Sequence, residues 1–484
     1  MRVKKFQHNS DLVSFQPSVR ILLVISLLFC VASSRVWSGA EGESKRESAS
    51  TGASGFASDS ASEANATMVK PISFDGILHG ASGTVDASLE ALVTAAITNH
   101  PSVLAQHARI VSAESNIKSA KWQFFPTPNV TLQRAYADAN DPSFQGDDNA
   151  YTVSLDQPLW TGGRLKAGVA SARAELAIAG AGVGDSEQSI SFRVVQAYGD
   201  WLSAWLQSQA LVTSLTTHQK LYDQVSRRQE AGVSNGSDLS LARGRLQSTK
   251  AQLVVVQAQQ ESAISVLSQI TNIELDSATL SKSRGVRPEL IQNIRVLLDE
   301  AVARDPSVER SLGEKRRTAA EIRSRKSALR PDVFLRFERD FGDFQFSNSG
   351  PDSRVIVGVR SQLGAGLSSL SSVASAEAEL KGSEAQINAN KQDVKERVLQ
   401  DYSLANSFSA RIVALEIAQV TAQDVSDSYA RQFLAGRKSW LDVMNAARDL
   451  QQAELQLADA QAGFLVVSWR LRIRVQGVPG GIHS

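Results

Sequence analysis

Two stretches of this sequence share one pattern, and they read Ala231-Gly-Val-Ser-Asn-Gly-Ser-Asp-Leu239 and Ala435-Gly-Arg-Lys-Ser-Trp-Leu-Asp-Val443. In each, a glycine closes a long helical pattern, and an aspartate follows in the first turn of the next helical pattern. These are the ordinary signals of a tight connection between two helices. Because Gly436 follows Gly232 by 204 residues, we predict that the chain contains the same helical hairpin twice.

The flanking sequence supports this duplication along its whole length. Pro101 and Pro126 return as Pro306 and Pro331, and residues 169–172 (Val-Ala-Ser-Ala) return unchanged as residues 373–376. The offset slips by only one residue across these matches, as expected for an internal repeat. We therefore divide the chain into a first repeat (84–272), a connector (273–292), a second repeat (293–475) and a C-terminal tail (476–484).

The N-terminus has the features of an export signal. Basic residues precede a largely apolar run, residues 21–32, and small residues follow it. Such a run suits a signal peptide, predicted here as residues 1–40, and is short for the alternative, a membrane anchor. Residues 41–83 are rich in Ser, Ala, Gly and Glu without a helical or strand period, and we expect a flexible arm. The only cysteine, Cys30, lies inside the predicted signal.

Composition limits the classes of function. The chain is 42% hydrophobic and 21% charged, which is typical of a folded protein. Its 51 Lys and Arg against 50 Asp and Glu provide no basic surface for nucleic acid. Since no other segment approaches the roughly 18 apolar residues of a transmembrane helix, entry into a membrane after export would need another structure.

Each repeat contains two segments in which apolar residues recur at every second position, as in a strand, and not at the spacing of about 3.6 residues that marks a helix. We predict strands at about residues 129–136 and 151–157 in the first repeat and about 332–339 and 353–361 in the second. In the first of these segments Val130 and Leu132 alternate with Asn129 and Thr131, so one face is apolar and the other polar. The helical tips are predicted at about residues 231–238 and 435–442.

Two interpretations of these strands stay open on alternation alone: a soluble β-hairpin that caps a helical bundle, or strands that cross an outer membrane. The export signal and aromatic residues at the strand ends favour the membrane. Those aromatics are Trp122, Phe124, Phe125, Tyr151 and Trp160. Because four strands cannot close a barrel and an open edge is not tolerated in lipid, a membrane protein of this kind must be an oligomer.

The duplication, the two tips and the segment Gln157-Pro-Leu-Trp-Thr-Gly-Gly-Arg164 together resemble the TolC family of outer-membrane efflux and secretion channels, over about residues 84–475. The resemblance implies a mainly α-helical chain with a small β part. It further implies a homotrimer with a shared β-barrel in the lipid of the outer membrane, continued by a periplasmic α-helical barrel. The implied partners are a periplasmic adaptor and an inner-membrane ABC or RND transporter.

The resemblance also assigns roles to tip residues. In that family the second tip narrows the periplasmic entrance, and the matching positions here are Lys438, Asp442 and Asn445, with Asp238 as the acidic partner from the first tip. We expect Lys438 to pair with Asp238, and a three-fold ring of Asp442 to favour cations or hold a divalent ion. The alternative is helix capping, since both aspartates fall in a first helical turn and Ser439 fits the capping pattern.

The remaining motifs point to structure and not to chemistry. Glycine pairs lack the Gly-Lys-Ser/Thr of a phosphate loop and are predicted to ease the strand-to-helix bend, together with Pro158. They are Gly162, Gly163, Gly364 and Gly366. Scattered histidines (His100, His107, His218) show no ligand spacing. We therefore expect no enzyme activity, cofactor or resident metal.

The sequence thus predicts a passive outer-membrane exit duct of a tripartite efflux or type I secretion system. A periplasmic coiled-coil adaptor or structural scaffold is the alternative. The segment 364–370 (Gly-Ala-Gly-Leu-Ser-Ser-Leu) is similar to family members that serve type I protein exporters, including adhesin secretion, while drug efflux stays open as a substrate class.

Overall fold

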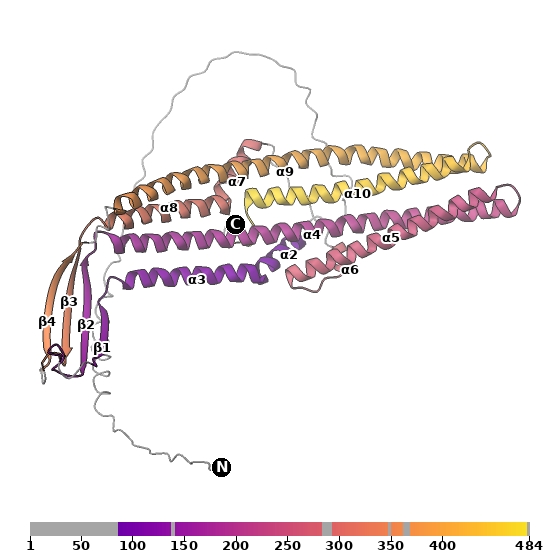
Figure 1. The fold of residues 1–484 in the computed structure, drawn as a ribbon. Helices are drawn as coiled ribbons and strands as arrows, with labels where there is room; N and C mark the ends of the chain where they lie inside the picture. Colours follow the sequence, from indigo (N-terminus) through magenta and orange to yellow (C-terminus); the bar gives the residue numbers. More distant parts are fainter. Residues whose placement is uncertain (1–85, 137–140, 283–292, 347–349, 362–367, 482–484) are drawn as a thin grey trace, which may run out of the picture. The chain divides into compact units, whose positions relative to one another are not determined.

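A computed structural model describes residues 86–136, 141–282, 293–346, 350–361 and 368–481 (Figure 1). The predicted signal, the arm at 41–83, and Gly364 and Gly366 lie outside these residues. The first repeat comprises α2 (Asp86–Asn99), α3 (Pro101–Trp122), β1 (Thr127–Arg134), β2 (Asn149–Trp160), α4 (Arg164–Glu230) and α5 (Gly236–Thr271). After α6 (Ser277–Lys282), the second comprises α7 (Ile294–Arg304), α8 (Pro306–Ser327), β3 (Asp332–Phe341), β4 (Asp352–Arg360), α9 (Ser368–Leu434) and α10 (Trp440–Gln476). The mainly α fold with a small β part is confirmed.

The two long hairpins are near copies of each other. Helices α4 and α9 each have 67 residues and each is followed by a short turn and a partner helix. At about 1.5 Å per residue, each long helix separates its strand from its turn by about 100 Å. Pro101 and Pro306 both begin a helix at the first position, where a missing N–H costs no hydrogen bond.

The strands of both repeats join in one antiparallel sheet with the order β1-β2-β3-β4. β2 pairs with β3 from Tyr151 opposite Phe341 to Trp160 opposite Val333, with a register shift between Pro158 and Trp160. β1 begins two residues earlier than predicted and leaves out Tyr136, while β2 extends to Trp160. Pro128 is tolerated in β1 because an edge strand needs only one row of ladder hydrogen bonds.

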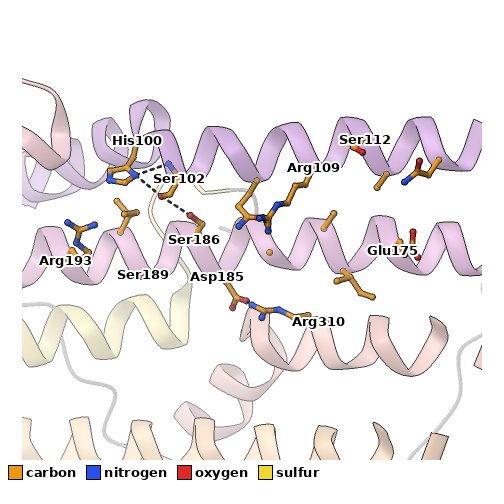
Figure 2. A pocket seen from close by; sticks show the side chains of 17 residues that line it. His100, Ser102, Arg109, Ser112, Glu175, Asp185, Ser186, Ser189, Arg193 and Arg310 are labelled. Atoms are coloured by element: carbon orange, nitrogen blue, oxygen red, sulfur yellow. Dashed lines mark hydrogen bonds and ion pairs between the residues drawn. The ribbon is translucent and has the colours of Figure 1, made fainter. Parts of the chain in front are cut away.

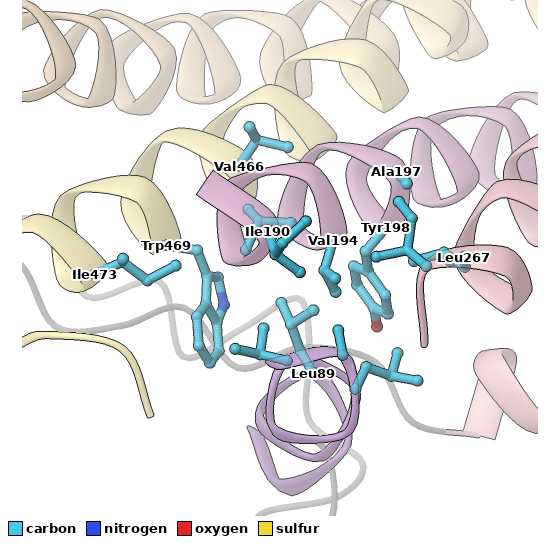
Figure 3. Close-up of a cluster of buried hydrophobic side chains, with 14 of the residues drawn as sticks. Leu89, Ile190, Val194, Ala197, Tyr198, Leu267, Val466, Trp469 and Ile473 are labelled. Atoms are coloured by element: carbon cyan, nitrogen blue, oxygen red, sulfur yellow. The ribbon is translucent and has the colours of Figure 1, made fainter. Parts of the chain in front are cut away.

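The largest apolar cluster lies where α2 crosses α4, beside α5 and α10 (Figure 3). Tyr198 and Trp201 of α4 are fully buried there, with ring centroids 5.3 Å apart, and Trp469 of α10 is equally buried. Burying a large aromatic side chain removes about 150–250 Å² from water, so these three residues dominate the energetics of the cluster. Tyr198 and Trp201 therefore serve to pack α4 against its neighbours.

One side of α5 also packs inward. Ala242, Leu246, Val256, Leu267 and Ile270 are all buried. A corresponding cluster in the second repeat joins α7, α9 and α10 around Leu297, Val394, Val398, Leu471 and Val475. Among the helices that the structure describes, none combines the length and the apolar character needed to span a bilayer.

Candidate functional site

The two tip turns have the same backbone geometry. Gly232 and Gly436 adopt φ values of 71° and 70°. In the first tip the Gly232 N–H donates to the Gln229 carbonyl (3.0 Å) and the Val233 N–H to that of Arg228 (2.8 Å). In the second tip, the Gly436 N–H donates to the carbonyl of residue 433 and the N–H of residue 437 to the carbonyl of residue 432. This is the Schellman motif, which needs a left-handed residue and therefore favours glycine.

Both helices that follow the turns begin with a side-chain cap at matched positions. The Asn235 side chain accepts from the Asp238 N–H (2.9 Å), and the Ser439 hydroxyl accepts from the Asp442 N–H (3.2 Å). Only the second tip forms a full capping box, because the Asp442 carboxylate also accepts from the Ser439 N–H (3.3 Å). The capping role expected for Asp442 is therefore present in the fold.

The predicted gate residues lie together on the second tip, except Asp238. The Lys438 ammonium is 4.0 Å from the Asp442 carboxylate and 4.2 Å from the centre of the Tyr429 ring. No ion pair joins Lys438 to Asp238 in the described residues, so that expectation is not met within one chain. Lys438 is held instead by a carboxylate and an aromatic ring of its own hairpin. Asn445 is half-buried one turn further along α10.

Hydrogen bonds stabilise the charged form of Asp442. The hydroxyl and backbone N–H of Ser439, and the nearby Lys438 ammonium, lower the pKa of this half-exposed carboxyl. Asp442 therefore remains charged across the neutral pH range. A ring of such carboxylates would attract cations.

An apolar cluster, the tip cluster, fixes the two tips to each other. Phe433 and Trp440 flank the second turn, with ring centroids 5.1 Å apart, and are 7% and 3% exposed. They pack with Leu221 and Val225 of α4 and Ala242 of α5. The Arg228 guanidinium lies 4.8 Å from the centre of the Phe433 ring. The burial of Phe433 shows that it anchors the tip.

At the other end of the long helices, one face of the sheet is largely apolar and exposed, and Arg339 is a charged residue near its far end. Eight of its side chains are between 40% and 70% exposed: Val130, Leu132, Tyr151, Leu155, Phe337, Val355, Val357 and Val359. In the described part of the chain, the outer edges of β1 and β4 pair with no further strand. A soluble surface rarely carries such a patch, so the face and both edges require a covering.

The opposite face carries a row of alternating charges. Arg336 of β3 contacts Asp156 of β2 (2.7 Å) and lies 4.0 Å from Glu338. Arg354 of β4 contacts Glu338 (3.4 Å) and also pairs with Asp340. Side chains from three strands thus form one continuous network. Sequence alternation predicted the polar face, but the pairing of β2 with β3 was needed to place these partners together.

The predicted interface aromatics gather at the two ends of the sheet. Near the helices, the Trp122 and Phe125 rings lie 5.1 Å apart, and both are more than half exposed. Phe124 and Trp160 are also exposed near this end, where the Gln157 side chain donates to the Phe124 carbonyl (2.9 Å). Tyr151 lies opposite Phe341 at the other end. The aromatics therefore form two separate groups.

The strand-to-helix bend depends on Gly162 in particular. Its φ is 58°, and an added Cβ would lie 2.8 Å from the Arg330 Cβ and 3.0 Å from the Ser327 carbonyl oxygen. The Arg330 guanidinium donates to the Gly162 carbonyl (3.1 Å). Gly163 is the N-cap of α4, and Pro158 lies at the register shift that ends regular pairing with β3.

A cavity of about 720 Å³ lies between α3, α4 and α8 (Figure 2). At one end the His100 ring caps α3 by accepting from the Ser102 N–H (3.2 Å). Burial and Arg193 lower the pKa of His100, so this cap is neutral at physiological pH. Asp185 pairs with Arg310 across the cavity. Within the described ranges, no group of three His, Cys, Asp or Glu side chains could hold a metal ion.

Comparison with known proteins matches both repeats to one family. Residues 92–272 and 297–472 match the outer membrane efflux protein family. The chain is 20% identical to the outer membrane efflux protein BepC of Brucella suis, over 82% of this chain and 87% of that protein. It is 23% identical to the outer membrane protein TolC of Escherichia coli, over 70% of this chain and 71% of that protein.

The fold is similar to that of solved outer-membrane proteins. The outer membrane protein VceC of Vibrio cholerae superposes with a TM-score of 0.70 at 18% identity, covering 82% of this chain and 97% of that structure. The open-state channel MtrE of Neisseria gonorrhoeae superposes with a TM-score of 0.63 at 15% identity, covering 84% and 95%. With both repeats matched, the chain belongs to the outer membrane efflux protein family.

Proposed function

We propose that three copies of this chain build one β-barrel in the outer membrane, each copy giving its four-stranded sheet. The protein is an outer-membrane efflux channel by family. One observation carries it: the sheet has an exposed apolar face and two edges that pair with no other described strand. Lipid would cover the face, and neighbouring copies would cover the edges. Three sheets give 12 strands, above the minimum of about eight for a closed barrel.

The dimensions of the sheet support this arrangement. Nine residue steps separate Tyr151 from Trp160 along β2, which is about 30 Å at 3.3 Å per residue. A strand tilted by about 40° then spans about 23 Å of membrane, close to the apolar band of about 25 Å in such barrels. Trp122, Phe124, Phe125 and Trp160 would form one aromatic girdle, and Tyr151 with Phe341 the other.

The charged face would line the lumen. Arg336 and Arg354 would then face water inside the barrel, where their pairing with Asp156, Glu338 and Asp340 keeps the wall polar and its strands in register. The paired hairpins α4–α5 and α9–α10 would continue this lumen as a helical tunnel about 100 Å long. The duct would conduct its cargo passively, with no bond made or broken.

Engineered cysteines test the barrel, because the chain's own cysteine lies in the predicted signal. Thr131→Cys in β1 combined with Ile356→Cys in β4 places thiols on the same face of the two edges. We expect oxidation to yield covalent trimers in extracted outer membranes. Thr152→Cys with Ile356→Cys is the control, since β2 is not an edge strand. A soluble periplasmic monomer without crosslinks would support the adaptor or scaffold alternative instead.

At the second tip, we infer a constriction formed by Asp442 from each copy, with Lys438 and Asn445 beside it and Asp238 on the neighbouring tip. The half-exposed, charged Asp442 supports this role. The tips would dock to a periplasmic adaptor and an inner-membrane transporter of ABC or RND type. Val233, which is 63% exposed beside the first turn, is a suitable crosslinking position. A photoreactive group at Val233 that captures no adaptor or transporter from intact cells would contradict docking through the tips.

A further inference from the structure

One carboxylate is shared by two arginines in the interior of the second repeat. Asp401 of α9 is 1% exposed and accepts from Nε of Arg474 (2.9 Å) and from Arg470 (2.8 Å), both on α10. Arg474 is 8% exposed, and its guanidinium lies 4.6 Å from the centre of the Phe192 ring. A single buried negative charge therefore faces two positive charges.

This arrangement leaves positive charge uncompensated. Removing an ion from water costs several kcal/mol, which is recovered only when its partners neutralise it. Burial lowers the pKa of Arg474 and Asp401 opposes that shift, but a guanidinium stays protonated at any physiological pH. The group formed by Asp401, Arg470 and Arg474 therefore carries one net positive charge.

The duplication shows that folding does not require these charges. At an offset of 204 residues, Asp401 corresponds to Ala197, Arg474 to Ile270 and Arg470 to Val266. Ala197 and Ile270 are buried at 5% and 4% in the same helical register. The first repeat thus builds the same packing from apolar side chains, which removes the purely structural reason for the charges in the second repeat.

The excess charge faces a cavity of about 420 Å³ between α4 and α10, which we name the arginine pocket. Its volume is in the range of pockets that bind small ligands. Arg193 of α4 lines it beside Arg470 and Arg474 and, among the described residues, forms no ion pair. Among the described residues that line the pocket, the one acid, Asp185, is already paired with Arg310. The remaining polar lining is uncharged: Gln188, Ser189 and Gln196.

We propose that the arginine pocket binds an oxyanion, a phosphate or carboxylate group held by Arg193, Arg470 and Arg474. Guanidinium groups match the paired oxygens of both groups, and the anion would neutralise the excess charge. Arg193 lies 29 residues along α4 from its first residue, which is about 45 Å from the sheet by helix rise. The ligand therefore reaches the pocket from water and not from the bilayer.

Calorimetric titration of the purified full-length protein in detergent tests the proposal. The probes are inorganic phosphate and citrate, each compared with sodium chloride at equal ionic strength. We expect saturable binding of at least one probe, and the arm that binds identifies a phosphate or a carboxylate ligand. Absence of saturable binding in both arms would overturn the proposal. Binding does not depend on channel activity, so the outcome is independent of the proposed barrel.

Three variants locate the binding. Arg193→Gln removes an exposed, unpaired guanidinium, and we expect about a tenfold weaker affinity, as for the loss of one charge-assisted hydrogen bond. Arg173→Gln on the exposed face of the same helix is the matched control and should bind as the wild type does. The triple variant Asp401→Ala, Arg470→Val, Arg474→Ile introduces the residues found at the matched positions of the first repeat. It should fold but not bind the anion. Unchanged affinity in Arg193→Gln would refute the assignment.

Discussion

The Ser439 hydroxyl and the Asp442 carboxylate oxygen lie 2.9 Å apart at the start of α10, and each residue also binds the backbone N–H of the other. The same carboxylate is the candidate constriction residue. Capping and constriction make different demands on this side chain. A cap needs an oxygen acceptor, whereas a cation ring needs the negative charge.

Substitution of each partner separates the two roles. We expect Asp442→Asn to weaken divalent-cation block in planar-bilayer recordings while the melting temperature changes little. Ser439→Ala removes the N-cap oxygen and should lower stability by about 1 kcal/mol, within a range of about 0.5–2 kcal/mol, with block retained. If Asp442→Asn leaves divalent block and conductance unchanged, Asp442 acts only as a cap.

Trp440 is expected to hold the second tip against the first. Truncating a buried Trp or Phe to Ala costs about 3–5 kcal/mol through lost burial and the cavity that remains. Trp440→Ala should therefore loosen the tip cluster, which limited proteolysis at the second turn would detect. The neighbouring Leu441 is 57% exposed, so Leu441→Ala is the matched control, with an expected effect within about 0.5 kcal/mol. Equal cleavage of both variants would exclude an anchoring role for Trp440.

Sequence patterns predicted the parts of this fold that depend on local periodicity. Both tip turns and the alternation within each strand are set by residues within a few positions of each other, and the repeat follows from matched positions 204 or 205 residues apart. Both ends of β1 were predicted two residues too late, because alternation alone does not mark where pairing with β2 begins and ends. The predicted capping by Asp442 also depends on residues that are close in the sequence.

Contacts between distant segments could not be predicted in this way. The pairing of β2 with β3 and the burial of Asp401 against α10 depend on how helices and strands that are far apart in the sequence meet. Asp401 resembled an ordinary surface acid on a polar helix. Only comparison with Ala197 at the matched position would have suggested that its face is buried.

We expect the buried His218 to make the protein less stable in acid. It is 2% exposed on α4, and burial with Arg245 lowers its pKa below the ordinary 6.5, with a hydrogen bond to Gln451 opposing the shift. Below pH 6.5 the unfolded chain binds a proton that the folded chain excludes, so stability present above this pH is lost as the pH falls toward the folded pKa.

The measurement is the melting temperature above and below pH 6.5. We expect His218→Gln to reduce the drop in melting temperature on acidification, because a neutral side chain has no proton to exclude. His107 is an exposed histidine on α3, and His107→Gln should preserve the full drop. A drop of the same size in His218→Gln and the wild type would assign the acid sensitivity to other groups.

The buried pair of Asp401 and Arg474 predicts strong coupling between two substitutions. Asp401→Ala leaves the Arg474 guanidinium buried without its partner and should cost about 3–5 kcal/mol, the usual penalty for breaking a buried ion pair. Adding Arg474→Ile recreates Ala197 and Ile270 of the first repeat, where the same register is filled by apolar packing. We therefore expect the double variant to regain most of the lost stability, measured as melting temperature in detergent. If the stability losses of Asp401→Ala alone and Arg474→Ile alone add up to the loss of the double variant, the pair is not coupled.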